Sequence, residues 1–268
     1  MKDKVVIITG GSSGIGRACA EVFGRKGSKI VVTGRNKQNL NETHKYLSDL
    51  GIAIHTVVTD VSRKEDNEFV VQETINTFGT IDILINNAGI SMRALFEDMD
   101  VEVLEKVMDI NFYGAVYATK AALPYIIKNK GSIIGISSIA GYRGLPARTG
   151  YSASKFAMQG FLEALRTELL KKGVHILVAC PGFTSSNIRN TALSKDGTAQ
   201  GDSPLDEGKI MPAITVAEEI YRATVKRQRD LVLTSQGKLT VFMNKWFPAF
   251  MDKMVYNHMA KEKDSPLK

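Results

Sequence analysis

The sequence predicts an α/β fold in which one parallel sheet is covered by helices on both faces, within a single large domain. Short β-branched runs alternate along the 268 residues with longer segments whose apolar residues recur at helical spacing. The strand-like runs are almost continuously apolar, which is typical of strands buried on both faces. An apolar fraction of 44% with 24% charged residues is ordinary for a globular protein of this size.

The expected strands are Val5–Thr9, Ile30–Thr33, Ile52–Val58, Ile81–Ile85, Ser132–Ser137, His175–Ala179 and Leu231–Leu233. Helical spacing occurs between them in Ile15–Lys26, Lys37–Leu50, Glu65–Phe78, Val101–Ile127 and Tyr151–Lys171. Glycines stand just before several strands, where helix C-caps with positive φ are expected: Gly27, Gly51, Gly79, Gly131 and Gly173.

Two segments near the C-terminal end depart from this alternation. The stretch at about 184–211 is polar and rich in Gly and Ser, and an irregular segment that long is typically a functional lid or disordered. Apolar residues then recur at helical spacing from Leu239 to Met259, and Pro248 is expected to divide this stretch into two helices. We therefore expect one domain over 1–235, with a substrate loop at about 184–211, and a C-terminal amphipathic helical extension over 236–268.

The net charge of +7 is concentrated near the C-terminal end, where Lys226 to Lys268 holds nine Lys and Arg against four Asp and Glu. Such a basic segment favours nucleic acid or an anionic membrane surface. No zinc-finger spacing or RNA-binding signature accompanies the charge, so we expect no nucleic-acid partner. For residues 239–259 two interpretations stay open: a helical lid or dimer contact, and shallow peripheral insertion into a membrane surface.

Several features predict a protein of the reducing cytoplasm. No apolar run is long enough to span a bilayer. The sequence passes from Met1-Lys2-Asp3-Lys4 directly into a strand, without the pattern of a signal peptide. Cys19 and Cys180 do not make a disulfide framework and are expected as reduced, buried thiols. The four His residues lack metal-ligand spacing and are expected at the surface, so no metal site is predicted.

A glycine-rich segment joins the first strand to the first helix, with the sequence Thr9-Gly10-Gly11-Ser12-Ser13-Gly14-Ile15-Gly16. Glycines permit a tight turn and close approach of the backbone to a pyrophosphate. The helix N-terminus that follows supplies N–H donors and a partial positive charge. This position in the first strand–helix unit predicts a dinucleotide site.

The spacing G-x-x-x-G-x-G resembles that of the short-chain dehydrogenase/reductase family in its common short form. Three further stretches resemble the family's motifs in the same order: Asn86-Asn87-Ala88-Gly89, Tyr151-Ser152-Ala153-Ser154-Lys155 and Pro181-Gly182. The resemblance covers about Lys4 to Ile188. It implies a doubly wound Rossmann-type fold, a three-layer sandwich with a seven-stranded parallel sheet. The Arg-Gly-Leu-Pro-Ala stretch before Tyr151 and the aromatic C-terminal segment are similar to the hydroxysteroid-dehydrogenase-like branch.

The resemblance implies which residues hold a nicotinamide cofactor. They are Gly10, Ser12, Ser13, Gly14, Ile15 and Gly16 in the glycine loop, Asp60 and Val61 at the adenine, Asn87, Ala88 and Gly89 along the cleft, Tyr151 and Lys155, and Pro181, Gly182, Thr184 and Ser186 near the nicotinamide. Ser186 stands where Thr is commoner in the family.

Arg35 indicates NADP(H) rather than NAD as the cofactor. A member of the family that prefers NAD has an acidic residue at the end of the second strand, where it accepts hydrogen bonds from the adenosine ribose. Here that position is Gly34, and the next residue, Arg35, can bind a 2′-phosphate through two parallel bonds. Many NADP-preferring members also carry Lys or Arg at the position of Ser13, which this chain lacks.

Tyr151 and Lys155 are spaced i and i+4 on an expected helix, so their side chains share one face. A neighbouring ammonium is expected to lower the pKa of the phenol, which then exchanges a proton with an alcohol or carbonyl oxygen. By the resemblance, Ser138 hydrogen-bonds the reacting oxygen, and Asn111 holds a water in a proton relay to Lys155. Ser137 is the alternative to Ser138, and alternation along the strand places it on the opposite side.

These residues predict an NADP-dependent carbonyl reductase or alcohol dehydrogenase that interconverts a secondary alcohol and a ketone or aldehyde. The expected substrate is a fairly large, hydrophobic small molecule. A homodimer or homotetramer is expected. Two other classes stay open: a nucleotide-binding sensor or scaffold without turnover, and a sugar-nucleotide epimerase or dehydratase. The presence of Asn111, Ser138, Tyr151 and Lys155 together disfavours the first, and the glycine spacing disfavours the second.

Overall fold

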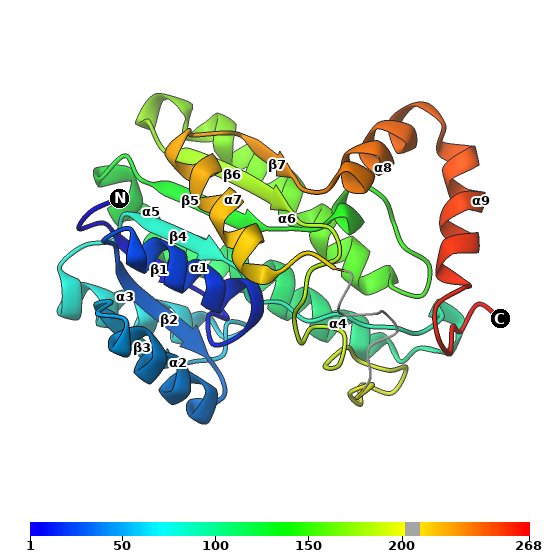
Figure 1. Cartoon of the computed structure of the whole chain (residues 1–268), viewed down its shortest axis with the longest axis horizontal. Coiled ribbons are helices and arrows are strands. Elements are labelled where there is room, and N and C mark those ends of the chain that lie inside the picture. The colour runs from blue at the N-terminus through cyan, green and yellow to red at the C-terminus, as the bar shows by residue number, and fades with distance from the viewer. Residues whose placement is uncertain (202–209) are drawn as a thin grey trace.

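The structure is a computed structural model that describes residues 1–201 and 210–268. Its centre is a seven-stranded parallel sheet in the order β3-β2-β1-β4-β5-β6-β7 (Figure 1). The strands are β1 Val5–Ile8, β2 Lys29–Gly34, β3 Ile54–Val58, β4 Ile83–Asn86, β5 Ser132–Ile136, β6 His175–Cys180 and β7 Asp230–Val232. The expected fold is therefore confirmed, because each of the seven predicted runs contributes a strand.

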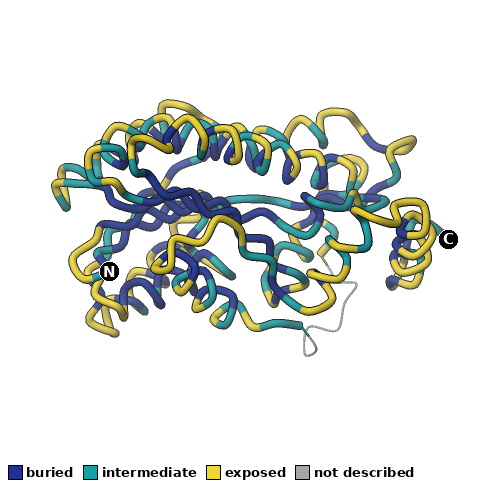
Figure 2. The backbone as a smooth tube through the Cα atoms, turned by 90° about the horizontal axis from the view of Figure 1, so that it is seen from above, coloured by how far each residue is buried: buried dark blue, intermediate teal, exposed yellow. Residues whose placement is uncertain are grey.

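Helices cover both faces of this sheet, as the buried strand layer between exposed outer helices in Figure 2 shows. One face packs against α1 (Gly14–Arg25), α2 (Lys37–Asp49) and α7 (Ala213–Val225). The other packs against α3 (Lys64–Phe78), α5 (Gly114–Lys128) and α6 (Thr149–Glu168). Neighbouring strand residues alternate between the two cores: Val6 and Ile8 belong to the first, Ile7 to the second. Strands buried on both sides explain the uninterrupted apolar runs.

The expected helix Val101–Ile127 is interrupted. Helix α4 covers Val101–Met108, a π-helical turn occupies Asp109–Tyr113, and α5 follows from Gly114. A π-turn inserts an extra residue into the helix and is frequent at functional sites. Helical periodicity alone does not reveal such an insertion, because the apolar pattern resumes after it.

Four of the five glycines expected as C-caps have positive φ, but Gly131 does not. There the preceding residue, Lys130, takes the left-handed conformation with φ of 48°. Gly131 serves a different need: a Cβ at this position would lie 2.0 Å from the carbonyl oxygen of Asp82. Close approach of two backbones, and not turn conformation, therefore requires glycine here.

The C-terminal extension forms two helices, α8 Ser235–Trp246 and α9 Pro248–Met259, which project beyond the sheet (Figure 1). Pro248 divides them as expected, because it stands at the start of α9 where its missing N–H is not needed. One side of α9 is buried through Met251, Val255 and Met259. Within the described residues, no helix is both long and apolar enough to cross a bilayer.

The expected loop at about 184–211 is described except for residues 202–209, which lie outside the described residues. Its first part runs back toward the segment after β4. Leu193 pairs there with Met92, and the Arg93 N–H donates to the Leu193 carbonyl at 2.8 Å. The loop is thus joined by backbone hydrogen bonds to the region where the motifs meet.

Candidate active site

The glycine loop lies between the end of β1 and the first turn of α1. Gly10 and Gly14 have φ of 62° and 52°, a conformation that L side chains rarely adopt. A Cβ on Gly10 would lie 2.8 Å from Cα of Ala88, so the loop also touches the segment after β4. Ser13 stands at the N-cap of α1 but makes no side-chain cap. By contrast, Asn36 caps α2 by accepting a hydrogen bond from the backbone N–H of Asn39.

The uncapped start of α1 fits a pyrophosphate. The first N–H groups of a helix need acceptors, and a phosphate supplies them together with favourable charge. Asn87 fixes the loop from the β4 side, because its side-chain amide donates to the carbonyls of Thr9 and Gly10, each at 2.9 Å. The Thr9 hydroxyl in turn accepts from the N–H groups of Asn87 and Ala88. The loop is therefore held in shape by the protein alone.

The residues expected at the adenosine meet at the ends of β2 and β3. A Cβ on Gly34 would lie 3.2 Å from Oγ of Ser12, so this position faces the glycine loop. Nη1 of Arg35 lies 3.8 Å from Oδ2 of Asp60, and the Arg35 side chain is 58% exposed. Partial burial of Asp60 works against ionisation, but hydrogen bonds from Ser62 and the charge of Arg35 hold its pKa below the ordinary value. Val61 packs against Gly114, where a Cβ would lie 2.9 Å away.

Tyr151 and Lys155 lie on the first turns of α6, directly beyond the end of β5. The buried Nζ of Lys155 donates to the carbonyl of Ile136 at 2.9 Å and lies 5.7 Å from the centre of the Tyr151 ring. Burial lowers the pKa of Lys155 to about 8. Ser138 begins the loop after β5, where its hydroxyl accepts from the Ala140 N–H at 3.1 Å.

The expected lowering of the Tyr151 pKa is wrong for the free chain. Burial raises the pKa of Tyr151, and this effect outweighs a hydrogen bond with Ser138 and the charge of Arg148. Desolvation penalises the phenolate more than these neighbours stabilise it. Tyr151 is therefore a protonated phenol at neutral pH, which is the form that donates a proton.

Asn111 occupies the π-turn and is completely buried. Its Oδ1 accepts from the Ile90 N–H at 2.8 Å, and its Nδ2 donates to the Ile90 carbonyl at 2.9 Å. Nδ2 also donates to Oγ of Ser154, whose hydroxyl donates to the Tyr151 carbonyl at 2.7 Å. Asn111 thus joins the segment after β4 to the helix that carries Tyr151. A Cβ on Gly89 would lie 3.2 Å from Asn111 Oδ1 and 3.5 Å from Lys155 Nζ, so both side chains lie close to Gly89.

The segment after β6 reaches the glycine loop and the start of α8. A Cβ on Gly14 would lie 3.2 Å from Cβ of Ser186, which places Ser186 against the loop. Thr184 is buried, and its hydroxyl donates to the carbonyl of Gly182. A Cβ on Gly182, which follows the buried Pro181, would lie 3.0 Å from the Thr234 hydroxyl. The structure therefore brings the ends of β1, β4, β5 and β6 together at one edge of the sheet.

Two polar residues behind the site, Ser154 and Gln159, were not predicted to take part in it. Gln159 donates to the Ser137 hydroxyl at 2.9 Å and to Sγ of Cys180 at 3.4 Å. Ser137 also donates to the Lys155 carbonyl, so its side chain points toward the backbone of α6. Burial raises the pKa of Cys180 to about 12, so this thiol stays protonated. The sequence feature that could have revealed these residues is the presence of polar side chains on the buried side of the expected helix that carries Tyr151.

The expectation that all His residues lie at the surface is wrong for His175. It is buried in β6, where Nδ1 pairs with the Ser132 hydroxyl and Nε2 with the Gln228 carbonyl. Burial lowers its pKa, so the ring is neutral at pH 7 and joins the starts of β5 and β6 to the segment before β7. Among residues 1–201 and 210–268, no cluster of three His, Cys, Asp or Glu side chains is suited to a metal ion.

Comparison with known proteins identifies the family. The family model described as short chain dehydrogenase matches residues 4–197. A Mus musculus protein named dehydrogenase/reductase SDR family member 7B is 35% identical over 99% of this chain and 84% of its own. An Arabidopsis thaliana protein named 11-beta-hydroxysteroid dehydrogenase 1A is 35% identical over 88% of this chain and 70% of its own. The chain belongs to the short-chain dehydrogenase/reductase family of oxidoreductases, and its similarity to the hydroxysteroid-dehydrogenase-like branch is confirmed.

Solved structures share the fold. A short-chain dehydrogenase/reductase from Burkholderia phymatum in complex with NAD matches with a TM-score of 0.82 at 24% identity, covering 93% of this chain and 95% of its own. An alcohol dehydrogenase from Thermococcus sibiricus complexed with 5-hydroxy-NADP matches with a TM-score of 0.76 at 23% identity, covering 87% and 96%. The family binds a nicotinamide cofactor, and this fold accommodates either form of it.

Proposed function

We propose that this protein is an NADP(H)-dependent oxidoreductase that interconverts a secondary alcohol and a ketone or aldehyde, with Tyr151 as the acid and base. The observation that carries the proposal is the convergence of Asn111, Ser138, Tyr151 and Lys155 at one edge of the sheet. A protonated Tyr151 beside the Ser138 hydroxyl suits the reduction of a carbonyl. Formation of an alcohol from an apolar ketone and NADPH tests the assignment.

The nicotinamide, when bound, supplies or accepts the hydride. In reduction, the Tyr151 phenol donates its proton to the carbonyl oxygen, and the Ser138 hydroxyl donates a hydrogen bond that orients the same oxygen. In oxidation the phenolate takes the proton from the alcohol. The Lys155 ammonium favours the phenolate that remains after proton donation. Asn111 fixes the segment from Gly89 to Ile90 against α6, so the proton donor keeps its position.

Arg35 supports NADP(H) as the preferred cofactor. Gly34 has no carboxylate to bind the ribose hydroxyls or repel a phosphate, and Arg35 beside it presents a largely exposed guanidinium. The glycine loop, the uncapped start of α1 and Asp60 with Val61 would hold the rest of the nucleotide. Thr184 and Ser186 would hold the nicotinamide end.

An apolar cluster beside Tyr151 supports a hydrophobic substrate. Tyr151 packs against a group formed by the segment after β4, helix α4 and the loop after β6. Its buried members are Met92, Ala94, Met99, Val103, Val107 and Leu193. The similarity to a protein named 11-beta-hydroxysteroid dehydrogenase 1A supports the same substrate class. A non-catalytic sensor or scaffold, and a sugar-nucleotide epimerase or dehydratase, are the alternatives, and NADPH-coupled formation of an alcohol excludes both.

Helices α8 and α9 carry an exposed apolar row that supports peripheral membrane contact. Its members are Leu239, Phe242, Trp246, Phe247, Phe250 and Met254, and Trp246 is 61% exposed. Lys238, Lys245 and Lys253 flank the row. Aromatic residues with basic neighbours favour shallow insertion into an anionic surface. We propose that one catalytic domain spans 1–235 and that the extension over 236–268 rests on a membrane from the cytoplasmic side. A helical lid or a dimer contact over the substrate pocket is the alternative role of these exposed residues.

Flotation with anionic vesicles distinguishes membrane contact from a dimer contact. The wild-type chain should float with phosphatidylserine-containing vesicles at low salt, and Trp246→Ser combined with Phe250→Ser should not. Leu170→Ser is the matched control, because Leu170 is 74% exposed on another surface. No flotation, together with a dimer that the double substitution dissociates, would establish the dimer contact instead.

A further inference from the structure

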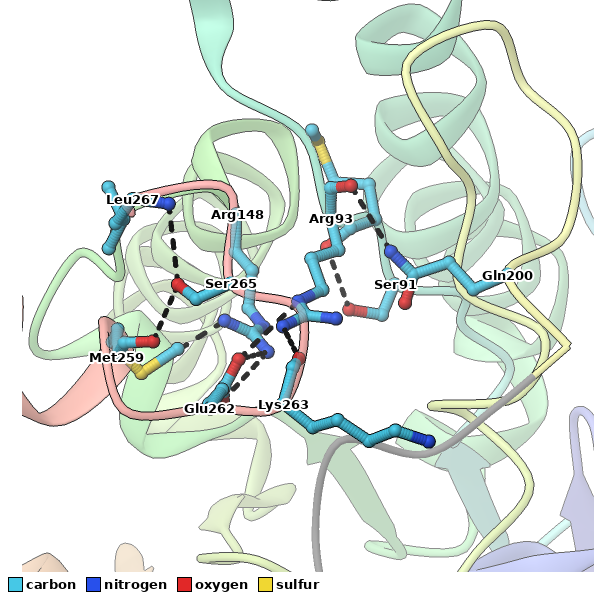
Figure 3. A network of polar contacts seen from close by, with 10 residues as sticks. Ser91, Arg93, Arg148, Gln200, Met259, Glu262, Lys263, Ser265 and Leu267 are labelled. Atoms are coloured by element: carbon cyan, nitrogen blue, oxygen red, sulfur yellow. Dashed lines mark hydrogen bonds and ion pairs between the residues drawn. The ribbon is translucent and has the colours of Figure 1, made fainter.

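A buried carboxylate near the C-terminal end joins two arginines from distant parts of the chain (Figure 3). Nη2 of Arg148 lies 3.0 and 2.8 Å from the two carboxylate oxygens of Glu262. Nε of Arg93 lies 3.4 Å from Oε2 of the same group. The side chains of Arg93, Arg148 and Glu262 are only 10%, 12% and 4% exposed. Such a pair is not a solvated surface contact.

Each arginine belongs to a segment that leads directly to the site. Arg148 immediately precedes α6, and its carbonyl accepts the N–H of Ser152, next to Tyr151. Arg93 follows Met92 of the apolar cluster that packs against Tyr151. The Arg93 guanidinium also donates to the carbonyl of Lys263, so the C-terminal segment is held at two points.

The turn before α6 contains a residue in an unfavourable backbone conformation, which contacts with neighbouring segments must stabilise. Ala147 is buried with φ of 59°, which is uncommon for a residue with a side chain. Its carbonyl accepts the Ala94 N–H at 3.0 Å, so the turn rests on the segment that carries Arg93. A conformation of this kind persists where surrounding contacts over-determine it. Glu262, in the C-terminal segment, supplies a contact to Arg148 from outside both segments.

The charges make the carboxylate necessary. Two guanidinium groups bind the same buried carboxylate, and burial lowers the pKa of Arg93, which the charge of Glu262 opposes. Removal of that carboxylate leaves two cations of like sign close together and poorly solvated. The two segments would then move apart.

We propose that Glu262 is a positioning residue, whose carboxylate clamps the segment after β4 to the turn before α6 and thereby sets the placement of Tyr151 against the substrate. The proposal rests on the proposed function in assigning Tyr151 to proton transfer. Cofactor binding does not depend on the clamp, because the glycine loop is held from Asn87 and Thr9. The C-terminal end thus acts on the substrate step alone.

Turnover and cofactor affinity, measured on the same preparation, test whether Glu262 affects the substrate step without affecting cofactor binding. Glu262→Gln should lower kcat for the best-reduced ketone of an apolar panel at least about tenfold, counted per NADPH-binding site so that unfolded protein does not contribute. The Kd for NADPH, from calorimetry, should stay within about twofold. Glu168→Gln, which removes an exposed carboxylate at the other end of α6, should leave both values unchanged. Glu262→Asp should recover part of the loss, because the charge remains.

A second variant keeps the test decisive where Glu262→Gln does not fold. Arg148→Lys retains the positive charge but replaces the planar guanidinium, which contacts Glu262 through Nη2 and Met259 through Nη1, and it should reduce kcat in the same direction. Glu262→Gln, Arg148→Met and the double variant that combines them form a cycle. The loss of kcat in the double variant should not exceed the loss in the worse of the two single variants by more than about twofold. Wild-type kcat in folded Arg148→Lys, or fully multiplicative losses in the double variant, would overturn the proposal.

Hydrogen exchange distinguishes failure of the clamp from failure of the proposed function. Arg148→Lys should speed exchange of backbone amides in residues 90–94 and 145–152, and leave residues 9–16 unchanged, whether or not any ketone is reduced. Unchanged exchange in the first two segments would contradict the clamp even in an active enzyme. Faster exchange in a protein that reduces no ketone would contradict the proposed function and leave the clamp standing.

Discussion

The proposed cofactor side and the proposed substrate side of Tyr151 are held together in different ways. On the cofactor side, Thr9, Gly10 and Asn87 fix the glycine loop by hydrogen bonds between adjacent strand ends. On the substrate side, Arg93 and Arg148 depend on Glu262, which is 114 residues beyond Arg148. The first arrangement follows from the sheet itself, whereas the second requires the C-terminal segment to return to the site. Substitutions should therefore separate the chemistry, cofactor binding and substrate placement.

Tyr151→Phe should remove proton transfer without disturbing cofactor binding or substrate placement, and it should cause the largest loss of turnover. The phenyl ring keeps the packing against the apolar cluster but has no proton to donate. Turnover of the best-reduced ketone should fall by about 10²–10⁴-fold, while the Kd for NADPH stays within a few fold. Stopped-flow and calorimetric measurements on the same preparation check both values. A folded Tyr151→Phe with wild-type turnover would remove Tyr151 from the mechanism.

Lys155→Ala should affect the cofactor side as well as the chemistry. Nζ of Lys155 is buried against the Ile136 carbonyl and lies close to Gly89, so its loss removes a charge from the position where nicotinamide ribose is expected. Turnover should fall by about 10²-fold or more, and NADPH affinity by about tenfold. Titration of NADPH into the variant measures the second value. Unchanged affinity would place Lys155 outside the cofactor site.

The pH dependence of NADPH binding should report Lys155. Because burial lowers the pKa of Lys155 to about 8, its ammonium is present below that pH and is lost above it. NADPH affinity should therefore fall as pH rises through about 8. Above that pH it should fall by about tenfold per pH unit, until it reaches the affinity of Lys155→Ala. Tyr151, whose pKa is raised, stays protonated through this range. A profile in Lys155→Ala that still bends near this pH would assign the transition to another group.

Arg35→Ala should act on the cofactor side alone. A charge-assisted hydrogen bond is worth about 1.5–3 kcal/mol, roughly tenfold to a hundredfold in affinity. Exposure of the Arg35 side chain, which lies 3.8 Å from Asp60, places the effect near the lower end. The KM for NADPH should rise by about this factor, and that for NADH should barely change. Equal increases for both cofactors would contradict a 2′-phosphate contact.

Gly34→Asp combined with Arg35→Ile should reverse the preference. The new carboxylate would accept from the ribose hydroxyl and repel a 2′-phosphate. A Cβ at Gly34 meets Ser12 Oγ at 3.2 Å, so Ser12 must shift by a few tenths of an ångström. The ratio of kcat/KM for NADH and NADPH measures the reversal, with Arg35→Ile alone as the control.

The parts that sequence predicted are those in which neighbouring residues determine structure. Seven apolar runs gave seven strands, and Tyr151 and Lys155 share a helix face because the helix repeat dictates it. The π-turn around Asn111 was not predicted, because its extra residue leaves the apolar pattern intact. The position of Glu262 was also not predicted, because a contact with Arg93 and Arg148 depends on how three distant segments pack. The sign of the Tyr151 pKa shift required the burial of the phenol, which spacing does not reveal.

The most direct test of the central claim is the stoichiometry of NADPH oxidation and alcohol formation with apolar ketones. The wild-type protein should form one alcohol for each NADPH consumed, use NADH at least severalfold less efficiently, and stop when Tyr151 is replaced by Phe. Tight NADPH binding with no product from any ketone or aldehyde, in protein that is folded and binds one cofactor per chain, would contradict the assignment and establish a nucleotide-binding protein without turnover.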